Sequence, residues 1–147
     1  MIEVKVKRLS DNVELPFYAT KGAAGMDLRA HLAEDLTIHP LERVAVPTGI
    51  AIGLPGEAYA AFIFARSGMA LKHGITLPNA VGVIDSDYTG EIKVALTNLG
   101  SEPFVIKNGD RIAQMVVMEI TKAKFVPVDC LDKTERGAGG FGSTGRD

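Results

Sequence analysis

The chain has 147 residues, of which 46% are hydrophobic and 23% are charged, and its formal net charge is −2. This length and composition are those of one soluble domain with enough residues for a real core. The charge gives no reason to expect binding to nucleic acid, and no apolar run approaches the ~20 residues of a membrane span.

The first residues alternate apolar with charged side chains and do not form a signal peptide. A single cysteine, Cys130, excludes an internal disulfide and suits a reducing compartment. We therefore expect a cytoplasmic protein with neither a nucleic-acid nor a membrane partner.

The first half of the chain has the pattern of short strands separated by turns. Residues 2–6 alternate in polarity, as in a half-buried strand or a charged sheet edge. Glycines and small residues before Asp27 indicate close backbone approach at the start of a short strand. Residues 36–54 read as strand, turn and strand, and residues 59–64 as a buried strand.

One short helix is predicted over residues 68–73, capped by Ser67 and ended by Gly74. Arg66 and Ser67 would bring a guanidinium and a hydroxyl to the first turn of this helix. Such a combination suits a phosphate. The alternative is a capped helix beside an exposed arginine.

Residues 79–92 have the pattern of a β-hairpin, in which two apolar strands flank a polar segment. That segment holds two carboxylates, Asp85 and Asp87, an aromatic residue, Tyr88, and a turn glycine, Gly90. A carboxylate at a hairpin end can deprotonate a water molecule, and a ring can form a wall for a sugar or base. The alternative is that the acidic residues only form the turn.

The second half continues with a strand at 103–106, a turn at 107–110 and an apolar strand at 112–120 that contains Gln114. The amide of Gln114 needs polar partners there, from the backbone, a neighbouring subunit or a ligand. Residues 122–128 would close the sheet. Many short strands with frequent turns predict an all-β fold, a jelly-roll-like barrel or sandwich with one short helix.

Two parts of unequal length follow from this pattern: a β domain at 1–131 and a flexible glycine-rich tail at 132–147. Residues 137–142 match G-x-G-x-x-G, but no strand, helix or βαβ unit surrounds them, so they are no dinucleotide fingerprint. The tail is either a strap that wraps around a bound ligand or a disordered segment without a function. The side chains that could wrap phosphates or stack on a base are Arg136, Phe141, Ser143 and Thr144.

The histidines lack metal-ligand spacing, and Cys130 has no paired histidine motif.

Five stretches in order carry a resemblance that covers nearly the whole chain: Ala24–Ala30, Ala65–Ala70, Gly82–Glu91, Gly109–Gln114 and the glycine-rich tail. They resemble the five motifs of the trimeric deoxyuridine triphosphatases (dUTPases). Two departures are visible: Met26 stands where many members have an aromatic residue, and Ala65 where many have proline.

The resemblance implies a β-jelly roll assembled as a homotrimer, with each active site between subunits and closed by the tail. The implied reaction converts dUTP and water to dUMP and pyrophosphate with Mg²⁺, which limits uracil in DNA and supplies dUMP for thymidylate synthesis. Asp85 would activate the water, Tyr88 would exclude a ribose 2′-hydroxyl, and Asp27 would order the water shell of the metal.

The resemblance further implies a set of residues that bind the substrate. Those for uracil would be Asn79, Gly82 and Val83; those for the phosphates Arg66, Ser67, Gly68 and Gln114; and those of the strap Arg136, Phe141, Gly142, Ser143 and Thr144.

Two other functions stay open at this point. One is a deoxycytidine triphosphate deaminase on the same fold, for which Glu57 or Glu91 would have to be the general base. The other is a non-catalytic nucleotide-binding protein that keeps the jelly roll. Release of pyrophosphate from dUTP, or of ammonia from dCTP, distinguishes the three.

Overall fold

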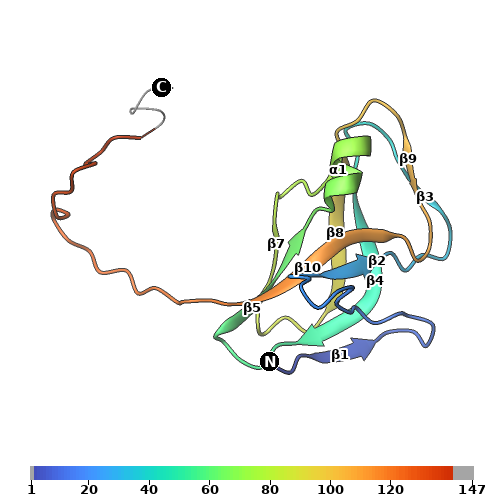
Figure 1. Cartoon of the computed structure of the whole chain (residues 1–147), viewed down its shortest axis with the longest axis horizontal. Coiled ribbons are helices and arrows are strands. Elements are labelled where there is room, and N and C mark those ends of the chain that lie inside the picture. The colour runs from blue at the N-terminus through green and yellow to red at the C-terminus, as the bar shows by residue number, and fades with distance from the viewer. Residues whose placement is uncertain (1, 141–147) are drawn as a thin grey trace.

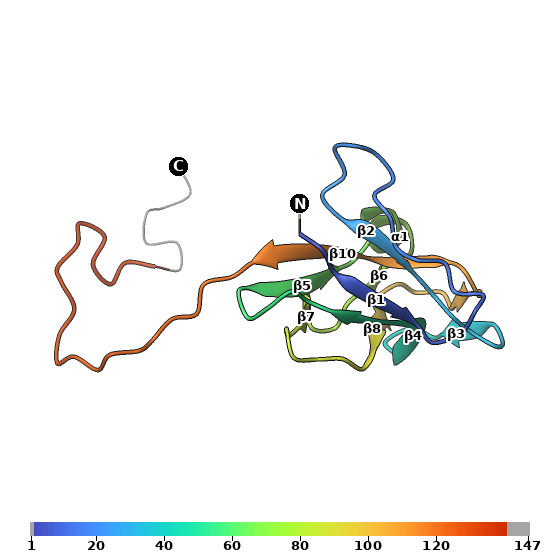
Figure 2. The same ribbon diagram turned by 90° about the horizontal axis from the view of Figure 1, so that it is seen from below.

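In the computed structural model, which describes residues 2–140, antiparallel strands pack as two layers with one short helix at the end of the sheets (Figures 1 and 2). The strands are β1 (Lys5–Arg8), β2 (Met26–Arg29), β3 (Leu36–Ile38), β4 (Arg43–Gly53), β5 (Tyr59–Phe64), β6 (Ile75–Thr76), β7 (Gly82–Ile84), β8 (Glu91–Asn98), β9 (Phe104–Ile106) and β10 (Arg111–Glu119). The helix is α1 (Ser67–His73). The predicted all-β class with one short helix is confirmed.

One four-stranded sheet has the order β1-β4-β8-β6 and the other the order β2-β10-β5-β7, while β3 pairs with β9. Alternate side chains of β8, namely Ile92, Val94 and Leu96, lie almost fully buried between the layers. Fully burying one such side chain stabilises the fold by ~1.5–3 kcal/mol. Among the described residues, no helix is long and apolar enough to cross a membrane.

The hairpin expected over residues 79–92 is wrong in its pairing. β7 pairs with β5 in one sheet, whereas β8 pairs with β4 and β6 in the other. Residues 85–90 therefore cross from one layer to the other. A hairpin turn and a crossing between two sheets both join apolar segments through a short polar one. The local sequence pattern therefore does not distinguish between these two connections.

The helix ends as predicted, because Gly74 takes the left-handed conformation with φ 70° and donates its N–H to Ala70. Its start differs from the prediction. Arg66 occupies the N-cap position without a side-chain cap, and Ser67 already belongs to the first turn.

Two further expectations need correction. All four residues of β1 are exposed, so the strand is not half-buried, but the alternative of a charged strand at a sheet edge is confirmed. Residues 122–128 form no strand: the chain leaves the sheets after β10 and runs away from them (Figure 1). Phe125 in this segment is 93% exposed.

Candidate active site

The connection between β7 and β8 carries the acidic and aromatic groups predicted for chemistry. Asp85 follows β7 directly and is exposed, and its carbonyl accepts the N–H of Tyr88 at 3.1 Å, which closes a tight turn. A cavity of about 300 Å³ lies beside this turn. Its lining residues are Glu57, Tyr59, Ala60, Asp85, Ser86, Asp87, Ile120 and Lys122.

Asn79 and Gly82 lie together at the other end of β7. β7 is an edge strand that packs tightly on β5: a Cβ on Gly82 would stand 3.0 Å from the Cβ of Ile63 and 4.0 Å from the amide nitrogen of Asn79. Ala80 has a positive φ of 61°, an uncommon conformation for alanine, and the N–H of Val81 donates to Asn79. This bend leaves the outer backbone edge of β7 without a strand partner.

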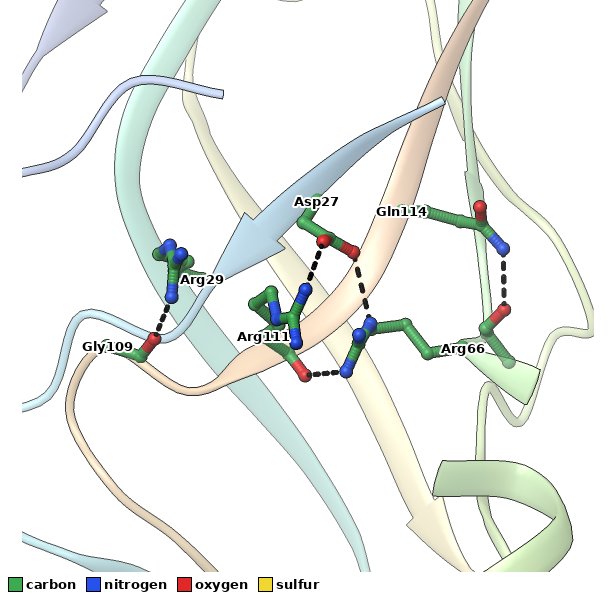
Figure 3. A network of polar contacts seen from close by, with 7 residues as sticks. Asp27, Arg29, Arg66, Gly109, Arg111 and Gln114 are labelled. Carbon is green, nitrogen blue, oxygen red and sulfur yellow. Dashed lines mark hydrogen bonds and ion pairs between the residues drawn. The ribbon is translucent and has the colours of Figure 1, made fainter. Parts of the chain in front are cut away.

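A charged cluster joins the start of β2, the end of β5 and the start of β10 (Figure 3). One carboxylate oxygen of Asp27 accepts the Nε–H of Arg66 at 3.0 Å, and the other accepts an Nη1–H of Arg111 at 3.2 Å. Arg66 also donates through Nη1 to the carbonyl of Arg111 at 3.2 Å. Two of the three nitrogens of the Arg66 guanidinium are thus engaged.

Gln114 lies half-buried beside this cluster (Figure 3). Its Nε2 donates to the carbonyl of Ala65 at 3.2 Å, which fixes the backbone just before Arg66. Gly25 allows the approach, since a Cβ there would stand 3.2 Å from the carbonyl oxygen of Met115 and 3.4 Å from Oε1 of Gln114. The predicted backbone partner of Gln114 and the close approach before Asp27 are confirmed.

A bulge allows β10 to place side chains both in the hydrophobic core and in the charged cluster. Its register against β2 shifts between Arg111 and Ala113, so that Ile112 and Ala113 are both buried. A bulge re-aims a neighbouring side chain, and Arg111 reaches Asp27. Arg111 is exposed at the start of the strand, and its carboxylate partner is Asp27. No local signal could have revealed a partner 84 positions away.

Ser67 and Gly68 are exposed in the first turn of α1, next to Arg66. A cavity of about 270 Å³ lies beside Arg66, and its lining residues are Arg66, Met69, Phe104, Ile106, Asp110, Arg111 and Ile112. Two guanidinium groups beside exposed backbone and hydroxyl groups suit an oxyanion.

Within one chain, Asp85 and Arg66 lie at opposite ends of β5. Ile84 pairs with Ala61, so Asp85 lies level with Ala60, while Arg66 follows the opposite end of β5. Six residues of extended chain separate the two levels, which is about 20 Å.

The strap residues are only partly described. Arg136 lies in a local turn, where its Nε donates to the carbonyl of Gly139 at 2.9 Å. Phe141, Gly142, Ser143 and Thr144 lie outside the described residues.

The two glutamates considered for a deaminase base are engaged elsewhere. Glu57 is bound to Lys122 at 2.6 Å, and this hydrogen bond, together with the positive charge of Lys122, lowers the pKa of Glu57. Glu91 accepts the N–H of Gly49 at 3.0 Å. A general base needs a pKa near the working pH, so the lowered pKa of Glu57 does not suit the task.

Between residues 2 and 140, no group of three or more histidine, cysteine, aspartate or glutamate side chains could hold a metal ion. Both carboxylate oxygens of Asp27 accept hydrogen bonds from arginines, although each oxygen keeps a second lone pair. This donor set suits a magnesium ion that arrives with a polyphosphate and its own water molecules.

Comparison with known proteins supplies independent findings. A model of the dUTPase family matches residues 11–145. The deoxyuridine 5′-triphosphate nucleotidohydrolase of Desulfitobacterium hafniense is 57% identical over 149 residues, which cover 99% of each chain. That of Zymomonas mobilis is 53% identical over 146 residues, which cover 98% of each chain.

Solved structures agree with the fold. A variant of the Staphylococcus bacteriophage 80alpha dUTPase with dUpNHpp superposes with a TM-score of 0.87 at 25% identity, covering 99% of each chain. A variant of the phage phi11 dUTPase of S. aureus, described with a structural Mg(II) ion, has a TM-score of 0.77 at 24% identity and shows a shared fold. It covers 87% of this chain and 97% of that chain.

Proposed function

The chain belongs to the dUTPase family and is a hydrolase of dUTP, and from this premise we propose that Asp85 activates the water that cleaves dUTP to dUMP and pyrophosphate. The observation that carries the proposal is the tight turn that presents Asp85 and Tyr88 together, exposed, at the end of β7. The reaction limits uracil incorporation into DNA and supplies dUMP for thymidylate synthesis.

Asp85 acts as general base. A carboxylate that is free of ion pairs can accept a proton from water while the water attacks phosphorus, and positioned proton transfer contributes ~10²–10⁴-fold to a rate. No salt bridge in the described part of the chain engages Asp85. The bound water is held between this carboxylate and the phosphate.

The outer edge of β7 reads uracil. An edge strand offers unpaired N–H and C=O groups, and uracil presents an N3 donor and an O4 acceptor. Cytosine reverses this pair, so its binding would leave polar groups of Gly82 or Val83 unpaired and is rejected. Asn79 lies against Gly82 and adds an amide to the same edge.

The phosphates bind at the other end of β5. Arg66 keeps one guanidinium nitrogen free of the hydrogen bonds that hold it, and Ser67 and Gly68 add a hydroxyl and backbone N–H groups. Gln114 holds this segment in place and contributes its amide. Hydrolysis of a triphosphate depends mainly on such charge stabilisation.

Asp27, through its remaining lone pairs, would order the water molecules of a Mg²⁺ ion bound to the triphosphate. Such an ion would supply neutralisation of part of the phosphate charge. Asp27 also fixes Arg66, and both roles place it on the phosphate side of the site.

The active site is shared between subunits of a homotrimer. Two features support this. The separation of Asp85 from Arg66 along β5, which is about 20 Å, favours a site that takes these two residues from different chains. In addition, the segment after β10 exposes Phe125, Val126 and Leu131, which are 93%, 69% and 85% exposed in the single chain and need a cover.

Residues 1–131 form the catalytic domain, and residues 132–147 close over the bound nucleotide. Arg136, Ser143 and Thr144 would bind the phosphates, while Phe141 and Gly142 would cover the base and exclude water. The proposed location is the cytoplasm, which suits the exposed thiol of Cys130.

The test is the variant Asp85→Asn. We expect it to lose pyrophosphate release from dUTP by at least ~10²-fold while binding of dUpNHpp, followed by calorimetry, stays within a few-fold of that of the unmodified enzyme. The amide keeps the size and the turn but cannot accept the proton. Full turnover in this variant removes Asp85 from its role.

A further inference from the structure

Tyr88 lies folded back over Gly90. Its hydroxyl donates to the carbonyl of Glu91 at 2.8 Å, and the side chain keeps 45% of its surface exposed. A Cβ on Gly90 would stand 2.7 Å from the hydroxyl oxygen of Tyr88, 2.8 Å from Cζ and 3.1 Å from Cε2. Carbon atoms do not approach so closely, so the ring and a side chain at residue 90 exclude each other.

The backbone at residue 90 does not itself demand glycine. Gly49, Gly74 and Gly109 have positive φ angles, and Gly90 does not. The three nearest atoms that a Cβ at residue 90 would meet all belong to the Tyr88 side chain.

The carbonyl that holds the tyrosine hydroxyl belongs to a fixed strand end. The Glu91 carboxylate accepts the N–H of Gly49, and the next carbonyl, that of Ile92, accepts the buried hydroxyl of Thr48 at 2.6 Å. β4 thus anchors the first residues of β8 through two hydrogen bonds. The hydroxyl of Tyr88 is thus bound to this anchored carbonyl of Glu91, and its ring occupies the space that a side chain at residue 90 would need.

We propose that Gly90 is a specificity-determining positioning residue, which sets the depth of the Tyr88 ring and so decides between deoxyribose and ribose. The inference rests on the proposed function, because it takes the ring as the wall beside the sugar. A ribose differs by one hydroxyl oxygen, so a displacement of the wall by about one ångström is enough to matter. A ring moved from its seat loses its contact with deoxyribose and no longer excludes the 2′-hydroxyl.

The experiment compares kcat/KM for dUTP and UTP in Gly90→Ala. We expect the preference for dUTP to fall by ~10-fold or more, with KM for dUTP rising more than kcat falls. The matched control is Gly22→Ala, because a Cβ on Gly22 meets nothing within 4 Å. The control should keep the preference unchanged, and an unchanged preference in Gly90→Ala overturns the inference.

A double-variant comparison shows whether Gly90 acts through the ring. Tyr88→Ala should itself lower the preference for dUTP, and adding Gly90→Ala to it should lower the preference no further. If Gly90→Ala lowers the preference for dUTP as much in the Tyr88→Ala background as it does alone, Gly90 acts apart from the ring and the inference is overturned. If Tyr88→Ala leaves the preference intact, the failure lies in the proposed role of Tyr88.

Tyr88→Phe provides a second route should Gly90→Ala not fold. It keeps the ring and removes the hydrogen bond to Glu91. We expect a smaller loss of preference for dUTP than in Tyr88→Ala. An unchanged preference for dUTP in Tyr88→Phe would show that the hydrogen bond to Glu91 does not set the position of the ring.

Discussion

Asp27 shows how one side chain can hold together two arginines that are far apart in the chain. It is 28% exposed and accepts hydrogen bonds from two arginines, Arg66 and Arg111. A surface ion pair contributes little to stability, but hydrogen bonds between charged groups at partly buried positions contribute more. The cluster leaves one excess positive charge at the place where the phosphates are proposed to bind.

Asp27→Asn tests this cluster at the residue scale. The variant loses the negative charge between two guanidinium groups, so we expect the free energy of unfolding to fall by ~1–2 kcal/mol and KM for dUTP to change more than kcat. Urea unfolding at a fixed chain concentration measures the first effect. Glu14→Gln is the matched control, because the Glu14–Arg29 pair has a similar distance of 3.1 Å but a more exposed carboxylate. A loss in Asp27→Asn no larger than in this control would contradict the structural role of the cluster.

The elements were predictable wherever their signal is local. Alternation predicted the buried face of β8, a glycine predicted the end of α1, and the turn at 107–110 preceded β10 as expected. Pairing between strands is not local. The polar segment after Asp85 has the composition of a hairpin turn, yet it crosses between sheets, since the choice depends on which distant strand each flank meets.

The same reasoning applies to the site. Gln114 could be selected from the sequence because an amide is unusual inside an apolar strand, whereas Asp85 and Tyr88 were distinguished from ordinary turn residues by the resemblance of their motif. The partnership of Arg111 with Asp27 could not, because it depends on a bulge and on contact between strands far apart in the chain. Residues 122–128 were expected to close the sheet, but within residues 2–140 they pair with no strand.

Gly74→Ala is the prediction at the scale of an element. Gly74 has φ 70°, and a Cβ there would stand 2.4 Å from the backbone nitrogen of Gly100. We expect a loss of stability above ~2 kcal/mol, from left-handed strain of ~1–2 kcal/mol plus the clash. Gly109→Ala is the control, because φ is 85° there but the space is open, so only the strain should appear. Equal losses in the two variants, measured by urea unfolding, would show that the contact of α1 with Gly100 contributes nothing.

At the scale of the whole molecule, the chain looks incomplete on its own. The edge proposed to read the base and the proposed general base lie along β7, and the groups proposed to bind phosphates lie beyond the far end of β5. An exposed apolar segment also leaves the sheets after β10. A symmetric assembly removes all of these features at once, since a closed ring repeats one contact and each contact can complete one site.

Subunit complementation tests this arrangement. Asp85→Asn and Arg66→Gln should each be nearly inactive, the first without a base and the second without its phosphate contact. In an equal mixture, half of the chains keep Asp85 and the other half keep Arg66. If a site takes Asp85 from one chain and Arg66 from another, both residues are intact in about a quarter of the sites. The refolded mixture should then recover about a quarter of the activity of the unmodified enzyme by random assembly, measured as pyrophosphate release.

The control for this experiment is a refolded mixture of Asp85→Asn with Asp85→Ala, in which no site can contain the base. It should stay inactive, which separates complementation from an effect of refolding. The quarter recovery depends on residues from different chains meeting at one nucleotide. A mixture of Asp85→Asn and Arg66→Gln as inactive as this control would instead place both residues at a site within one chain.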